Sequence, residues 1–153
     1  MFMEDQEKEP GFVNTIYDES SIDPEILPAV RALRNAGIET IASNSGIGQI
    51  GTNDMWGSYI QILLPSSDNI EIAKKIDVFA KKITPELQEK FQNPGIFLQL
   101  VSAEKWLKDT NTTSVEIDAI PVFRLQLIGC TRDEEISGIW KIISKRFNPS
   151  DVA

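Results

Sequence analysis

Histidine is absent from the 153-residue sequence, and cysteine occurs once, as Cys130. Without histidine the chain lacks the commonest general base, the commonest metal ligand and the serine–histidine or cysteine–histidine pairs of nucleophilic enzymes. A single cysteine excludes an intrachain disulfide and a cysteine-cluster metal site. Because no nucleophile and base can be named, we favour a non-catalytic protein with no metal and no cofactor.

Long apolar runs and basic stripes are also missing. No segment approaches the roughly 20 apolar residues of a membrane helix. The acidic N-terminus, MFMEDQEKEPGF, contains no apolar segment of the kind that marks a secretory signal. No stripe of Lys and Arg with interleaved aromatic residues appears. We therefore expect a cytoplasmic protein that binds neither membranes nor nucleic acid.

Negative charge is concentrated at the N-terminus. Residues 1–25 hold eight of the 23 acids and one of the 15 bases, so the other 128 residues hold 15 acids and 14 bases. We expect residues 1–11 to form an acidic flexible arm and residues 12–150 to form a single α+β domain, as the length also favours. The arm is either a solvated tail or a segment that docks on a basic partner.

Hydrophobic periodicity predicts both strands and helices. Short β-branched or alternating segments predict strands, and apolar residues at helical spacing predict three main helices. The predicted strands are 38–43, 59–64, 96–101 and 121–130, with a weaker one at 12–17. The helices are predicted to begin at Asp23, near Asp68 and, by a capping box that joins Thr131 to Glu134, at the turn after the last strand.

Proline predicts a break in the second helix. The apolar stripe from Ile72 to Ile83 is followed by Thr84-Pro85-Glu86. A proline in a helix interior removes a backbone hydrogen bond, whereas a proline at the first helical position is well tolerated. We therefore expect one helix to end near Ile83 and a short second helix to run to about Phe91.

The predicted strands carry polar residues at alternate positions, which indicates that one sheet face lies outside the main core. A mostly antiparallel sheet of four to five strands, with three helices packed on one face, fits this pattern. The nearest common architecture is the ferredoxin-like split βαβ arrangement. Strands 38–43 and 59–64 should pair across a long loop. The exposed sheet face or the strand edges would be the surface for a homo-oligomer.

The loop between that pair of strands, residues 43–57, is the candidate site. It holds four of the nine glycines, which let backbone amides approach a ligand closely. Hydroxyl and amide side chains add donors and acceptors, an indole offers a stacking surface, and an arginine on the polar sheet face would clamp a phosphate. The predicted ligand-binding residues are Ser43, Asn44, Ser45, Gly46, Gly48, Gln49, Thr52, Asn53, Trp56 and Arg124.

Residues 46–51 read GIGQIG, a literal G-x-G-x-x-G. The dinucleotide-binding fingerprint requires a helix directly afterwards, whose N-terminal amides hold the pyrophosphate. Here the turn-rich segment TNDMWG leads into a strand instead. A P-loop is also excluded, because no Gly-Lys-Ser/Thr follows.

Two functional hypotheses remain. In the first, the chain is a non-catalytic domain whose glycine-rich loop, residues 43–57, sequesters a small polar or phosphorylated molecule such as a nucleotide. The plain alternative is a long hairpin loop without a ligand. In the second hypothesis, the chain is a protein-interaction module, an inhibitor or adaptor, that engages a partner through its acidic arm.

Overall fold

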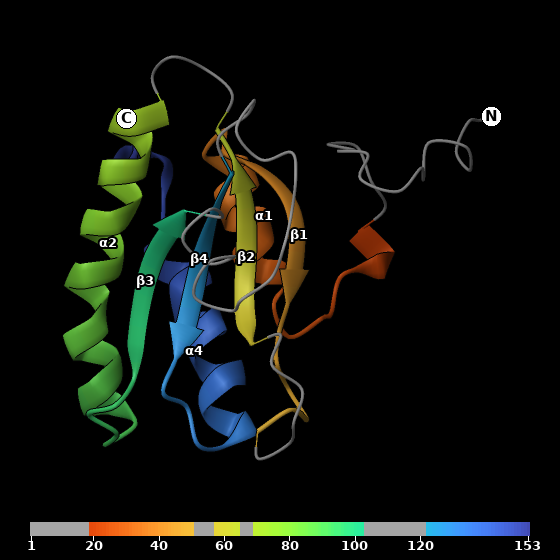
Figure 1. The fold of residues 1–153 in the computed structure, drawn as a ribbon, viewed down its shortest axis with the longest axis vertical. Coiled ribbons are helices and arrows are strands. Elements are labelled where there is room, and N and C mark those ends of the chain that lie inside the picture. Colours follow the sequence, from red (N-terminus) through yellow and green to blue (C-terminus); the bar gives the residue numbers. More distant parts are fainter. Residues whose placement is uncertain (1–18, 51–56, 65–68, 103–121) are drawn as a thin grey trace.

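The computed structural model describes residues 19–50, 57–64, 69–102 and 122–153. Its elements are η2 (Glu19–Ser21), α1 (Leu27–Asn35), β1 (Glu39–Asn44), β2 (Ser58–Leu63), α2 (Asn69–Lys90), β3 (Phe97–Ser102), β4 (Val122–Ile128), α4 (Asp133–Arg146) and η3 (Pro149–Asp151). The strands form one sheet in the order β1-β2-β4-β3, with every neighbouring pair antiparallel (Figure 1). The predicted α+β class and the predicted pairing of β1 with β2 are confirmed.

β2, α2 and β3 form a split β-α-β unit. β2 and β3 each pair antiparallel with β4, so they run parallel to one another with β4 between them. Followed as a cycle from β2, the order is β2-α2-β3-β4-α4-α1-β1. This is the β-α-β-β-α-β succession of the ferredoxin-like fold, with two helices, α4 and α1, before the last strand. The predicted split βαβ arrangement is confirmed, with the strand that would close this succession placed before the others in the chain.

One hydrophobic core lies between the sheet and the three α-helices. On the sheet, Ile60 of β2 pairs with Leu125 of β4 and both side chains are buried. The helices contribute the apolar stripes that the sequence predicted, since these stripes place one face of each helix against the sheet. Their fully buried members include Val30 and Leu33 in α1, Ile76 and Leu87 in α2, and Ile139 and Ile143 in α4.

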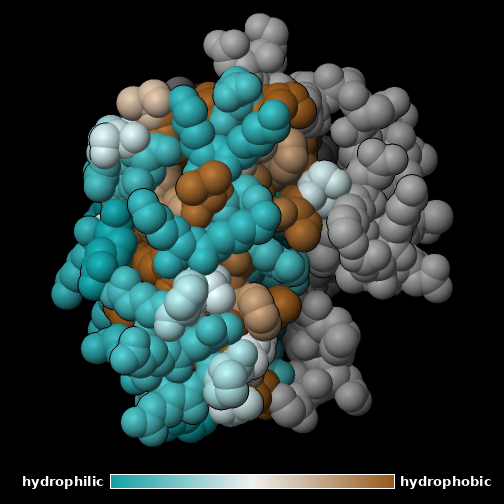
Figure 2. Space-filling view, turned by 90° about the vertical axis from the view of Figure 1, so that its left-hand side faces the viewer, coloured by the Kyte–Doolittle hydropathy of each residue, from teal (hydrophilic) through white to brown (hydrophobic). Residues whose placement is uncertain are grey.

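The outer side of α2 faces water. Lys74, Lys81 and Lys82 are exposed, since they lie on the helix face opposite the apolar stripe. Figure 2 looks onto this side of the molecule and shows a mostly hydrophilic surface with separate hydrophobic patches. Ile70 and Val78 are the exposed large apolar residues of this helix. Scattered apolar residues of this kind are normal on a protein surface.

α1 begins later than the sequence predicted. The turn after Asp23 is closed by the amides of Ile26 and Leu27, which both donate to the Asp23 carbonyl, while Asp23 Oδ1 accepts from the Glu25 amide at 2.9 Å. The helix itself starts at Leu27. Pro28 lacks the amide that would continue a regular helix from this turn. Asp23 therefore caps the turn that leads into α1 and not the helix.

α2 passes through Pro85 without ending, so the predicted break is wrong. Leu87, beyond the proline, is fully buried and continues the apolar stripe of this helix. Burial of that stripe favours a continuous helix, because tertiary packing supplies most helical stability in proteins. The Thr84 hydroxyl also donates to the Ala80 carbonyl at 2.8 Å. Packing and this bond together outweigh the amide lost at Pro85.

Thr84 also covers part of the outer edge of β3. Its Oγ1 accepts a hydrogen bond from the Leu98 amide at 3.2 Å and lies 3.4 Å from the Leu98 carbonyl oxygen. Among the described strands, β3 lies at one edge of the sheet. Backbone groups along such an edge are a template for pairing with another chain unless something covers them. A helix side chain occupies this position here.

Candidate functional site

The described part of the predicted loop is held against two other elements. The Ser45 hydroxyl donates to Asp23 Oδ2 and accepts from the Ile47 amide at 3.2 Å. Further along the loop, the Gly48 amide donates to Asp133 Oδ1, at the start of α4, at 3.1 Å. The loop therefore bridges the turn before α1 and the first turn of α4. Ser45, which is 2 % exposed, takes part in this anchoring through both hydrogen bonds.

Asn44 closes the base of the loop. Its Nδ2 donates to the Gly57 carbonyl at 2.5 Å and to Gln49 Oε1 at 3.3 Å. Gly46 packs against the returning strand, because a Cβ added there would lie 3.2 Å from the Gly57 oxygen. These contacts bring the two described ends of the loop together and hold them beside the first residue of β2.

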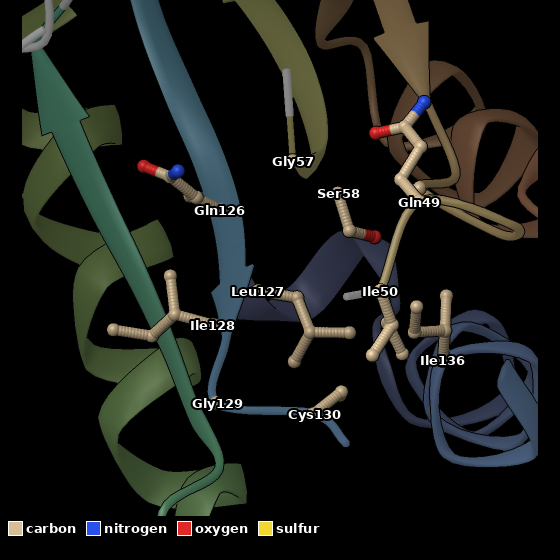
Figure 3. A pocket seen from close by; sticks show the side chains of 11 residues that line it. Gln49, Ile50, Gly57, Ser58, Gln126, Leu127, Ile128, Gly129, Cys130 and Ile136 are labelled. Atoms are coloured by element: carbon tan, nitrogen blue, oxygen red, sulfur yellow. The ribbon is translucent and has the colours of Figure 1, made fainter. Parts of the chain in front are cut away.

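A cleft of about 240 Å³ lies between this loop and the end of β4 (Figure 3). Ser58, the first residue of β2, pairs with Leu127, one residue before the end of β4. β4 therefore extends one residue beyond the start of β2, and the cleft forms at this end of the sheet. The apolar part of the lining is made by Ile50, Leu127, Ile128 and Ile136. Figure 3 shows Gln126 and Ile128 on one side of β4 and Leu127 on the other.

The polar side chains of this lining differ in their hydrogen bonds to other residues. Ser58 Oγ accepts a hydrogen bond from Trp140 Nε1 at 2.7 Å, and Gln49 Oε1 accepts from Asn44. The Gln126 carboxamide makes no hydrogen bond with any residue in the part of the chain that the structure describes. Gln126 is partly buried, and its side chain lies beside Gly57. Its donor and its acceptor are therefore both open to a ligand.

Cys130 lines the same cleft but is not activated. Burial, together with the negative charge of Glu135, raises the pKa of the Cys130 thiol to about 12. The thiolate is the nucleophilic and metal-binding form of cysteine. At neutral pH the thiol stays protonated, so Cys130 acts as an apolar part of the lining.

The turn after β4 is fastened by a buried carboxylate. Glu135 accepts hydrogen bonds from the Thr131 amide at 2.8 Å, from Asn93 Nδ2 at 3.2 Å and from Arg132 Nη2 at 3.4 Å. Burial acts to raise the pKa of Glu135, but these hydrogen bonds and the charge of Arg132 outweigh it and lower the pKa below its ordinary value. Glu135 is thus ionised at neutral pH.

This carboxylate replaces the predicted capping box. The N-cap of α4 is Arg132, which makes no side-chain cap bond, and the acid that reaches back to Thr131 is Glu135 and not Glu134. Beside it, Gly129 approaches Gly95 so closely that a Cβ on Gly129 would lie 1.8 Å from the Gly95 oxygen. Gly129, which lines the cleft, therefore packs directly against the α2–β3 turn.

Arg124 is not part of the cleft lining. It lies on the sheet face opposite the helices, where its guanidinium sits 3.5 Å from the centre of the Tyr59 ring and its Nε donates to Gln61 Oε1 at 3.2 Å. Arg124 is 2 % exposed. Burial lowers its pKa, and Tyr59 opposes that shift. Tyr59 and Gln61, the partners of this guanidinium among the described residues, both belong to β2.

The structure separates the predicted ligand-binding residues into groups. Gly46 and Gln49 line the cleft, whereas Asn44, Ser45 and Gly48 hold the loop in shape. Ser43 and Arg124 belong to strands, and Thr52, Asn53 and Trp56 lie outside the described residues. Sequence reasoning missed Gln126 as a site residue. The alternation of Gln126 with Arg124 along the strand predicted that Gln126 lies on the polar face. No local pattern in the sequence shows that β4 extends beyond the start of β2.

Comparisons with known proteins do not identify the chain: no family model, no curated protein and no solved structure matches it. Within the described ranges, no three His, Cys, Asp or Glu side chains come together as a potential metal site. The helices of those ranges are also too short or too polar to cross a membrane. The function is therefore inferred from the cleft alone.

Proposed function

We propose that this chain is a non-catalytic domain that binds a small neutral molecule in the cleft between the loop and the end of β4. The lining is the observation that supports this proposal. It combines apolar side chains with a few amide, hydroxyl and backbone groups, as small-molecule sites generally do. The cleft, at about 240 Å³, is smaller than the roughly 300–1,000 Å³ of drug-sized sites, so the ligand is small.

The titratable groups favour binding without turnover. Among the described residues of the lining, Cys130 is the one titratable side chain, and its thiol stays protonated. General acid–base catalysis needs a group whose pKa lies near the working pH. A ligand in this cleft would meet donors, acceptors and apolar surface, but none of the described lining residues supplies such a group.

The charges around the cleft favour a neutral ligand over a phosphorylated one. The described lining contains no Lys or Arg, and Arg124 contacts Tyr59 and Gln61 on the sheet face. Asp133 touches the loop, and ionised Glu135 is close enough to raise the pKa of Cys130. An anion entering the cleft would meet these carboxylates, and the described lining holds no Lys or Arg that would bind it.

The test is a titration of the full-length ¹⁵N-labelled chain, followed by NMR chemical shifts. We expect neutral fragments to shift the resonances of the cleft saturably, with no chemical change in the fragment, and inorganic phosphate and nucleotides to leave them in place. Ile50→Trp, which fills the cleft from an exposed position of its lining, should weaken binding at least about tenfold. Ile70→Trp, at an exposed position on α2, should not.

Two results would contradict the proposed function. One is the lack of any saturable shift with neutral fragments. The other is equal binding by the Ile50→Trp and Ile70→Trp variants, which would place the fragment outside the cleft. Binding of phosphate or nucleotide at the cleft would reject the preference for neutral ligands and restore the hypothesis of a phosphorylated one.

A further inference from the structure

We infer that the ligand of this cleft carries a neutral edge with a donor beside an acceptor, as in a carboxamide, lactam or urea, and that this edge pairs with the Gln126 carboxamide. The inference rests on the proposed function, because it names the chemical class of ligand for the same cleft. It makes Gln126 the residue that sets specificity.

The side-chain amide of Gln126 is the main observation behind this inference. Its oxygen and nitrogen make no hydrogen bond within the described residues, whereas Ser58 and Gln49 in the same lining already accept bonds from Trp140 and Asn44. A glutamine amide presents one acceptor next to one donor. A planar edge with the complementary order forms two parallel hydrogen bonds with it, which is the most specific pairing open to this group.

The position of Gln126 fits a ligand that is apolar on one side and polar on the other. Leu127, the next residue along β4, points to the opposite side of the strand and faces the region of Ile50 and Ile136 (Figure 3). Gly57 faces Gln126 and has no side chain to cover Nε2, since a Cβ added at Gly57 would contact that nitrogen at 3.6 Å. A ligand would place its apolar body among Leu127, Ile50 and Ile136 and extend its edge past Gly57 to the amide.

The charges around the cleft disfavour ligands of similar size that carry a carboxylate or an ammonium group. A carboxylate would face the field of Glu135 and Asp133 with no Lys or Arg in the described lining. An ammonium would lose its hydration against Ile50, Leu127 and Ile136, and the described lining holds no carboxylate to pair with it. Burying a charge without a partner is costly, whereas a neutral amide can satisfy its polar atoms on Gln126.

Four probes of nearly equal size and different chemistry test this inference: benzamide, methyl benzoate, benzoate and benzylammonium. Each is titrated into the full-length labelled chain, and the shifts of Gly57, Gly129 and the Gln126 side-chain amide are followed. We expect benzamide to bind about three- to tenfold more tightly than methyl benzoate, which accepts but cannot donate. That ratio corresponds to one net hydrogen bond. The two ions should bind more weakly than either neutral probe.

Gln126→Leu removes the amide and keeps a side chain of similar bulk. Its matched control is Gln99→Leu on β3, because Gln99 pairs with Gln126 on the same sheet face but does not line the cleft. Gln126→Leu should abolish the preference for benzamide over methyl benzoate, and Gln99→Leu should preserve it. Well-dispersed spectra of both variants would show that each is folded.

The outcomes separate the inference from the proposed function. If neutral probes bind but benzamide has no advantage, or if Gln126→Leu leaves that advantage intact, the ligand class is wrong while the cleft remains a binding site. If benzoate or benzylammonium binds most tightly, the ligand class is also wrong. If no probe or neutral fragment shifts the resonances of the cleft, the proposed function itself is overturned.

Discussion

A single carboxylate, that of Glu135, joins the α2–β3 turn to the turn between β4 and α4. Glu135→Gln replaces a charged acceptor by a neutral one of the same shape. Because hydrogen bonds to charged groups contribute about 1.5–3 kcal/mol, we expect the free energy of unfolding at pH 7 to fall by about that amount. Urea denaturation measures it. The control Glu134→Gln, at an exposed position one residue earlier, should leave the stability nearly unchanged.

The same residue gives the stability a pH dependence with a defined sign. Its pKa in the folded chain lies below the ordinary value of 4.5. Ionised Glu135 therefore stabilises the fold above that value, and the contribution is lost as the pH falls through the lower, folded-state pKa. Below about pH 4.5 the unmodified chain should lose stability more steeply than Glu135→Gln. Parallel pH profiles of the two proteins would contradict this role.

At the scale of an element, Thr84 connects α2 to the edge of β3. Thr84→Val keeps the shape of a side chain that is 6 % exposed and removes its hydroxyl. The Leu98 amide then loses its partner, which should cost about 1–3 kcal/mol. The uncovered edge should also make the chain self-associate. Sedimentation velocity at several concentrations checks this, and a variant that stays in the same state as the unmodified chain would argue against edge protection by Thr84.

The elements themselves were predictable because local rules and tertiary packing agree in most of them. The apolar stripes of Ile76 in α2 and Ile139 in α4 predicted helices that the structure confirms. The helix break predicted at Pro85 is wrong because burial of Leu87, a tertiary effect, outweighs the local rule that proline interrupts a helix. The capping box predicted at Thr131 is wrong because two glutamates follow at nearly the same spacing, and only the fold shows that Glu135 is the buried one.

The candidate site was predicted only in part, for a related reason. The glycine content of the loop marked it as the candidate site, and Gly46 and Gln49 do line the cleft. The opposite wall depends on sheet register, which sets the end of β4 beyond the start of β2. Register follows from long-range pairing, so a single sequence could mark Gln126 as a residue of the polar face but not as a neighbour of the loop.

At the scale of the whole molecule, the net charge of −8 resides mostly in residues 1–25. Binding of a basic partner through the arm would be screened by salt. We expect a deletion of residues 1–18, which spares the pairs of Glu19 with Arg31 and Arg34, to abolish salt-sensitive complexes in a pull-down at low and high salt. The cleft variant Ile50→Trp should retain them. Complexes that survive the deletion would rule out the arm as the contact.

The hydrogen bond between Trp140 and Ser58 has a further, optical consequence. Trp140 is fully buried, and its indole N–H ends on a hydroxyl in the cleft lining. The emission of an indole depends on the polarity around it and on the hydrogen bond that its nitrogen makes. With Trp56 and Trp106 replaced by phenylalanine, the chain would hold one tryptophan, Trp140, behind the lining of the cleft. Its own fluorescence would then report occupancy without an attached label.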